Sequence, residues 1–329
     1  GMFQGLKQHR VRNREPWPLD PSLLDAVLIT HGHLDHIGML PRLVRDGFSG
    51  PVFGTAPSLE VGRIVMEDSA KIHVEEAARA REEGYSSHPD PQPLYTPEDA
   101  LKATALLKAV PRDQWQTLSK GVRFRFRYNG HILGAAFIEL EVGGKRFVFS
   151  GDVGRPEDEL LGPPNHPEQA DVLLRESTYG NKRHPQTDIE ALLAGHINAT
   201  IREGGACIIP SFAVERLQTV MYLLWKLLRT NRIPRLPIYV DSPMGENVLD
   251  LFERFPHWHR LSMADYHGMR REMKVIVDYR DTWKAIDDTR PKVVVAGSGM
   301  LSGGRVLTYL SQLLDRETTR ILLVGFQAE

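Results

Sequence analysis

The chain has 329 residues, more than a single hydrophobic core commonly holds, which indicates two domains. Its 41 Lys and Arg residues nearly balance 42 Asp and Glu residues, so the overall charge favours neither a nucleic acid nor a membrane as partner. The single cysteine, Cys207, excludes a disulfide framework, and no apolar run is long enough to cross a membrane. These features predict a cytoplasmic protein.

The first elements in chain order are a buried strand and then helices. The apolar run Leu23–Thr30 predicts the strand. Helical patterns follow near Ile37–Asp46, at Ser58–Glu82 and at Pro97–Val110. The period then changes to two, because Val122–Tyr128 alternates arginine with apolar residues, and this predicts a half-buried strand.

Strand signals continue through the next part of the chain. Residues Ile138–Val142 and Lys145–Ser150 are joined by two glycines, which predicts a β-hairpin. Residues Ala170–Ser177 predict a further strand. The first region is therefore rich in strands, with helices attached to them.

Beyond a boundary that we expect near His184, helices and strands alternate. Helices are predicted at Thr187–Glu203, Val214–Arg229, Gly245–Phe255 and Arg305–Leu314, and strands at Ala206–Pro210, Pro237–Val240, Lys292–Ala296 and Arg320–Gly325. Such alternation is typical of a doubly wound parallel sheet. The sequence therefore predicts an α/β protein with domains at 1–184 and 185–329.

Six side chains that commonly bind metals occur in three motifs, each beginning where a predicted strand ends. They are His31, His33, Asp35 and His36 in H-G-H-L-D-H, His131 in N-G-H-I-L-G, and Asp152 in S-G-D-V-G. Imidazole and carboxylate groups bind first-row metals, and α/β proteins place their sites at strand ends. The alternative is a polar cluster without metal, which would leave several partly buried ionisable groups in need of partners.

These motifs resemble the metallo-β-lactamase superfamily, whose ligand motifs occur in the same order. The resemblance implies an αββα sandwich that holds two zinc ions with an activated water between them. The first zinc would be held by His31, His33 and His131, the second by Asp35 and His36, and Asp152 would bridge them. Asp35 would also orient the attacking water.

Four further segments resemble the β-CASP branch, which inserts a doubly wound α/β domain and cleaves nucleic acid. They are Leu174–Gly180, Ile209–Arg216, Val240–Met244 and Ala296–Met300. The most similar group contains the pre-mRNA 3′-end cleavage subunit and its bacterial and archaeal relatives. This resemblance implies a zinc-dependent ribonuclease that hydrolyses phosphodiester bonds of single-stranded RNA, within the strand or from an end.

Three residues outside the ligand motifs are further candidates. Glu176 matches the acidic residue of a β-CASP motif and would orient a general acid, unless it is an ordinary carboxylate at a strand end. Ser298 and Arg305 lie in a glycine-rich turn before a helix, where backbone N–H groups suit a substrate phosphate. Tight turn geometry explains those glycines equally well.

A stripe of arginines lies on the predicted strand at Val122–Tyr128. Arg123, Arg125 and Arg127 share one face and could follow an RNA backbone. We prefer the interpretation that they form a solvated strand face.

Compared with the family pattern, the chain opens after the strands that normally start the first sheet. It also closes before the return to the first domain, and before motifs B and C with their histidines. We therefore expect a fragment of a longer nuclease, which binds the first zinc more tightly than the second and cleaves RNA weakly or not at all alone. Assembly as a homodimer or within an RNA-processing complex is a further expectation.

Two other functions are considered. A non-catalytic RNA-binding or scaffold subunit is disfavoured because all six ligands are intact. A small-molecule metallo-hydrolase, such as a thioesterase or lactonase, is disfavoured by the resemblance of the second region to a β-CASP domain.

Overall fold

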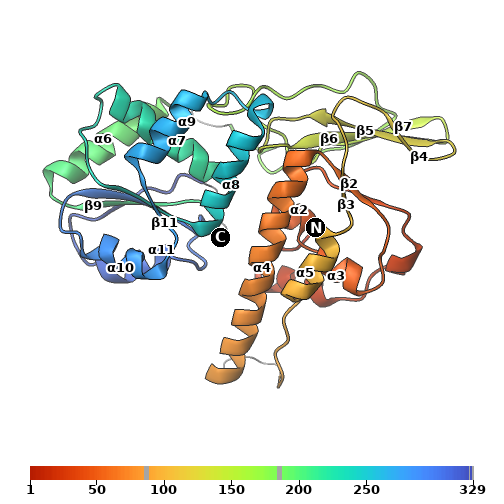
Figure 1. The fold of residues 1–329 in the computed structure, drawn as a ribbon, viewed down its shortest axis with the longest axis horizontal. Coiled ribbons are helices and arrows are strands. Elements are labelled where there is room, and N and C mark those ends of the chain that lie inside the picture. Colours follow the sequence, from red (N-terminus) through yellow and green to blue (C-terminus); the bar gives the residue numbers. More distant parts are fainter. Residues whose placement is uncertain (85–88, 184–186, 326, 328–329) are drawn as a thin grey trace. The chain divides into compact units, whose positions relative to one another are not determined.

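The computed structural model describes the protein at residues 1–84, 89–183, 187–325 and 327. The chain divides into two compact units (Figure 1), of which unit 1 is Gly1–Thr178 and unit 2 is Tyr179–Glu329. The boundary predicted near His184 lies outside the described residues. In the part of the chain that is described, no helix combines the length and apolar character needed to cross a membrane.

Unit 1 contains two sheets that pack face to face. The parallel sheet β1-β2-β3 consists of Val27–Leu28, Val52–Gly54 and Leu107–Ala109. The second sheet, β4-β5-β6-β7-β8, consists of Gln116–Ser119, Val122–Tyr128, Ala136–Val142, Lys145–Phe149 and Val172–Leu174. Alternation along β5 turns Phe124 and Phe126 to the same buried face. There Phe124 meets Phe53 of β2, with ring centroids 5.1 Å apart.

Helices cover the other face of the parallel sheet. They are α1 (Lys7–Arg10), η1 (Val11–Arg14), η2 (Pro21–Leu23), α2 (Leu34–Ile37), α3 (Leu40–Arg45), α4 (Ala56–Glu83) and α5 (Pro97–Thr104). Apolar side chains of α2, α3, α4 and α5 form one core with Ile29 and Val52, while the neighbouring Leu28 and Phe53 face the second sheet. Unit 1 is therefore layered as helices, sheet and sheet.

Unit 2 is a doubly wound parallel sheet, as predicted. Its strand order is β11-β10-β12-β9-β13, from Lys274–Ile276, Ile238–Asp241, Lys292–Ala296, Ala206–Pro210 and Arg320–Ile321. The helices are α6 (Ile189–Arg202), α7 (Arg216–Arg229), α8 (Pro243–Arg254), η3 (Pro256–Trp258), α9 (Met263–Glu272), α10 (Tyr279–Asp287) and α11 (Val306–Leu313). Figure 1 shows α10 and α11 on one side of the sheet and α6–α9 on the other.

Three expectations about local structure differ from the observed fold. The first strand is Val27–Leu28 only, because Pro21–Leu23 forms a 3-10 turn before it. The predicted helix Pro97–Val110 ends at Thr104, and Leu107–Ala109 pairs with β2 instead. The elements α9, β11 and α10 were not predicted. Short apolar runs suit a helix or a strand equally well, and only a neighbouring strand decides between them.

Candidate metal centre

The three ligand motifs converge on one edge of unit 1 because of strand pairing. His131 and Asp152 follow β5 and β7, and these strands run in the same direction because each is antiparallel to β6. Their carboxyl ends therefore reach the same edge. The end of β1 joins them there, since the Ala136 N–H donates to the Thr30 carbonyl at 2.9 Å. This places His31 beside the other two motifs.

Four side chains at this edge form cluster 1, which consists of His31, His33, His131 and Asp152. One nitrogen or oxygen atom from each lies within 4.8 Å of all the others. His131 Nε2 is 3.2 Å from His33 Nδ1 and 3.4 Å from Asp152 Oδ2. His31 Nε2 is 3.9 Å from the same carboxylate oxygen. Such an arrangement points three imidazoles and one carboxylate at a common centre.

Cluster 2 consists of Asp35, His36 and Asp152. His33 is the N-cap residue of α2, so Asp35 and His36 lie in its first turn. His36 Nε2 is 3.1 Å from Asp152 Oδ1 and 3.4 Å from Asp35 Oδ2. Burial acts to lower the pKa of His36, but hydrogen bonds and charges from the two carboxylates outweigh it and raise the pKa to about 9. Asp152 thus turns one oxygen toward each cluster.

The imidazoles of cluster 1 have depressed proton affinity. Burial, then the neighbouring imidazoles, lowers the pKa of His31 well below its ordinary value, and the same causes lower the pKa of His33 to about 4. Burial also lowers the pKa of His131. These three side chains are therefore neutral near pH 7, and a neutral imidazole is the form that binds a metal.

A buried nitrogen without a partner indicates that cluster 1 accommodates a cation. His31 is fully buried, and its Nδ1 lies 3.2 Å from Thr30 Oγ1. Its Nε2 has no hydrogen-bond partner among the described residues, although buried polar atoms are normally paired. Two atoms that are each bonded to one zinc ion at about 2.0–2.1 Å can be at most about 4.2 Å apart. The distances from His131 to His33, from His131 to Asp152 and from His31 to Asp152 are 3.2, 3.4 and 3.9 Å, and all lie below that limit. The residues therefore fit a divalent metal.

Comparison with protein families agrees with this geometry. The family described as "Beta-lactamase superfamily domain" matches residues 2–216, and the family described as "Beta-Casp domain" matches residues 217–329. The chain belongs to the β-CASP branch of the metallo-β-lactamase superfamily. The predicted family and the mixed α/β fold are thereby confirmed, and this superfamily fold implies binding of a divalent metal.

The names of individual relatives include two ribonucleases and a transcription termination factor. A ribonuclease of Thermus thermophilus is 35% identical over 336 residues, covering 100% of this chain and 73% of its own length. The transcription termination factor FttA of Pyrococcus horikoshii is 31% identical, over 94% of this chain and 48% of its own. The endoribonuclease ysh1 of Schizosaccharomyces pombe is also 31% identical, over 94% and 40%. The chain thus spans less than half of the latter two.

The acidic residue predicted from the β-CASP motif lies next to the metal centre. Glu176 follows β8, which is parallel to β7 and ends at the same edge. One carboxylate oxygen accepts from the Val153 N–H at 3.4 Å and the other from the Thr178 N–H at 2.9 Å. The Glu176 N–H donates to Ser150 Oγ at 3.1 Å. Glu176 is therefore attached to the loop that carries Asp152.

Ser298 and Arg305 lie in unit 2, in the turn that joins β12 to α11. The Ser298 hydroxyl is 3.5 Å from Ser302 Oγ. Arg305 donates to Asp241 Oδ1 at 2.7 Å and to the Val277 carbonyl at 2.6 Å. The Arg305 guanidinium is therefore engaged by an acidic side chain of its own unit.

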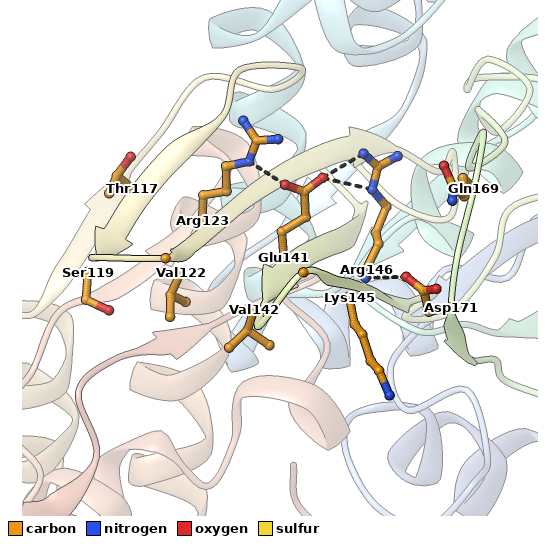
Figure 2. A pocket seen from close by; sticks show the side chains of 12 residues that line it. Thr117, Ser119, Val122, Arg123, Glu141, Val142, Lys145, Arg146, Gln169 and Asp171 are labelled. Atoms are coloured by element: carbon orange, nitrogen blue, oxygen red, sulfur yellow. Dashed lines mark hydrogen bonds and ion pairs between the residues drawn. The ribbon is translucent and has the colours of Figure 1, made fainter.

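The arginine stripe is paired with glutamates of the neighbouring strand. Arg123 lies opposite Glu141, and Arg125 opposite Glu139, with an ion pair in each case. Glu141 also accepts from Arg146 at 2.6 Å, in the wall of a hollow of about 460 Å³ (Figure 2). The stripe is thus largely neutralised on its own sheet and is a poor track for an RNA backbone.

Two residues that hold the ligands in place were not predicted. Thr30 faces the ring of His31, and Asn129 contacts the loops of His131 and Asp152. Asn129 stands two residues before His131 in the N-G-H motif, but the sequence does not show that its amide reaches a segment more than twenty residues away.

Proposed function

We propose that the protein is a zinc-dependent ribonuclease that hydrolyses phosphodiester bonds of single-stranded RNA. The observation that carries the proposal is cluster 1 with cluster 2 beside it, sharing Asp152. The names of the relatives support RNA as the substrate, since they include a ribonuclease and an endoribonuclease. All of these side chains come from the region that matches the metallo-β-lactamase family.

Zinc is proposed because its preferred ligands are those that the clusters supply. The three imidazoles of cluster 1 would hold one ion, Asp35 and His36 would hold a second, and Asp152 would serve both. Two such ions stabilise the attacking and leaving oxygens of a displacement at phosphorus. Cluster 2 offers one imidazole, where cluster 1 offers three. We therefore propose that it binds its ion more weakly.

The chain's own carboxylates have separate roles in this proposal. Asp35, half exposed at the edge of cluster 2, would accept a hydrogen bond from the attacking water and orient it. Glu176 keeps its backbone contacts to Val153 and Thr178 and would orient a proton donor to the leaving oxygen.

On the substrate side, Ser298 is proposed to contact an RNA phosphate through its hydroxyl. Arg305 is proposed to hold the same turn through Asp241, because its charge is already engaged there. An arginine that neutralises a phosphate needs a free guanidinium face.

The test is cleavage of a single-stranded RNA labelled at either end, by protein loaded with Zn²⁺. We expect shortened products that disappear with chelator and return with added Zn²⁺. The Asp152→Asn variant is expected to yield none. Cleavage that persists in chelator, or turnover of a thioester or lactone with no RNA cleavage, would contradict the proposal.

A further inference from the structure

The side chain of Asn129 connects the two loops that carry ligands of cluster 1. It is only 1% exposed. Its Nδ2 donates to the Asp152 carbonyl at 2.7 Å and to the Ser150 carbonyl at 3.0 Å. Its Oδ1 accepts from the His131 N–H at 3.3 Å. A primary amide is the side-chain group that offers two donors and an acceptor in this arrangement.

The sheet alone does not set the spacing between these loops. His131 follows β5 and Asp152 follows β7, but β6 lies between those strands. The backbones of strands separated by one neighbour are roughly 9–10 Å apart, whereas beyond these strands the Gly154 N–H lies 3.0 Å from the Asn129 carbonyl oxygen. Both loops must therefore bend toward each other beyond the sheet edge. The Asn129 amide bridges them there.

The backbones of the two loops also touch at the same place. The Gly154 N–H donates to the Asn129 carbonyl at 3.0 Å. A Cβ on Gly154 would lie 2.0 Å from the Gly130 carbonyl oxygen, so the two loops are already in contact. A loss of the amide bridge would remove the donor to the Ser150 carbonyl in a buried contact and to the Asp152 carbonyl in a part-buried one, which favours separation of the loops.

We propose that Asn129 is a positioning residue of the metal centre, which holds His131 against Asp152 and so sets the affinity of cluster 1 for its ion. It touches neither metal nor substrate and acts through the two ligand loops. The inference rests on the proposed function only in requiring that cluster 1 binds a divalent metal. It does not depend on whether RNA is the substrate.

Gln218 offers a matched control in unit 2. It is fully buried, and its Nε2 donates to the carbonyls of Ala213 and Gly245, each at 3.1 Å. It therefore joins the loop before α7 to the first turn of α8 with a primary amide, and neither segment carries a residue of the clusters. Gln218→Ala reports what the loss of a buried amide bridge does to the protein in general.

The experiment measures Zn²⁺ affinity by competition with a chromophoric chelator, together with the visible absorption spectrum of the Co²⁺-loaded protein. We expect Asn129→Ala to weaken Zn²⁺ binding by about 10–100-fold, the range for residues that support metal ligands. The Co²⁺ bands should shift, because the ligand geometry changes. Gln218→Ala should lower the melting temperature of the metal-free protein and leave both metal readouts at wild-type values.

The proposal is overturned if Asn129→Ala keeps wild-type Zn²⁺ affinity and spectrum, or if both alanine variants lose affinity equally. Should the alanine variant not accumulate as folded protein, Asn129→Ser offers one hydroxyl in place of the amide and is expected to show an intermediate loss of affinity. A serine variant with unchanged affinity would likewise overturn the proposal. Loss of Zn²⁺ affinity in a protein that never cleaves RNA would support this inference and contradict the proposed function.

Discussion

Each unit of the molecule contains buried polar side chains at strand ends, and the two groups differ in how they are satisfied. In unit 2, the fully buried Asp241 accepts from Thr282 and Tyr309, at 2.7 and 2.8 Å, and pairs with Arg305. In unit 1, the imidazoles of cluster 1 face one another, and the buried Nε2 of His31 has no hydrogen-bond partner among the described residues.

The difference separates a structural cluster from a binding site. Polar groups that satisfy one another inside the protein stabilise the fold and have no capacity left for a ligand. A buried ring nitrogen without a hydrogen-bond partner among the described residues, as at His31 Nε2, is unfavourable until a cation arrives. By this criterion we expect the Asp241 cluster to be structural and cluster 1 to bind a metal, although both stand at strand ends. The predictions below test that distinction, from the largest expected effect to the smallest.

Asp152→Asn tests the metal site most directly. Because both clusters share this carboxylate, we expect Zn²⁺ affinity to fall by more than about 100-fold, beyond the range for supporting residues. RNA cleavage should fall with it. The metal-free melting temperature should change little, since the side chain is 30% exposed. Titration calorimetry measures the loss of Zn²⁺ affinity, with Asp171→Asn as the control because Asp171 is an exposed carboxylate directly before β8. Equal losses of Zn²⁺ affinity in both variants would contradict the assignment of Asp152 to the metal site.

Asp241→Asn tests the structural cluster. The substitution leaves the Arg305 guanidinium without its charged partner, and we expect the free energy of unfolding of unit 2 to fall by about 3 kcal/mol. Urea denaturation measures this loss. Zn²⁺ affinity should stay at the wild-type value. A variant that kept its stability but lost Zn²⁺ would reverse the roles assigned to the two clusters.

Metal binding itself should stabilise only the unit that contains the clusters. At about 100 times its dissociation constant, Zn²⁺ is expected to raise the free energy of unfolding of unit 1 by about 2.7 kcal/mol. Hydrogen exchange with and without Zn²⁺ can locate this effect, with protection expected near His131 and Asp152. Protection confined to unit 2 would contradict the assignment.

Lys292 provides a pH-dependent test of a satisfied buried charge. Its Nζ donates to the carbonyls of Ala285, Ile286 and Asp288, and burial lowers its pKa from 10.5 to about 8. Between about pH 8 and 10.5 the unfolded chain therefore binds more protons than the folded protein, so this group adds stability as pH rises. In thermal unfolding, the melting temperature of wild type should rise relative to that of Lys292→Met as the pH increases across that window. A difference in melting temperature that stays constant with pH would contradict the prediction.

The smallest effect is expected in the salt dependence of RNA binding. If Arg305 acts through Asp241, the double variant Asp241→Asn with Arg305→Gln removes both charges and leaves the salt slope unchanged. A direct phosphate contact would instead reduce the slope by about 0.7 for a single strand. Fluorescence anisotropy with labelled RNA over a series of salt concentrations distinguishes the two.

Much of the fold and most of the candidate site could be predicted because they depend on local patterns. The strands Ala206–Pro210 and Lys292–Ala296 were predicted with their observed bounds, since long apolar runs in an alternating α/β pattern leave few choices. The segment Leu107–Ala109 was mistaken for helix because only its pairing with β2 makes it a strand. The interval that contains α9, β11 and α10 lacks a strong pattern of its own.

The sequence by itself determined which side chains can bind a metal, because ligand identity and motif order are properties of the chain. Only the tertiary structure decided how they are used. Strand pairing brings the loops of His131 and Asp152 to the same edge on either side of an intervening strand, and the Asn129 amide spans them, so that the two side chains lie 3.4 Å apart. The tertiary structure likewise pairs Arg305 with Asp241, which are 64 residues apart in the sequence. Such partners are set by packing between distant segments, and no local pattern encodes that distance.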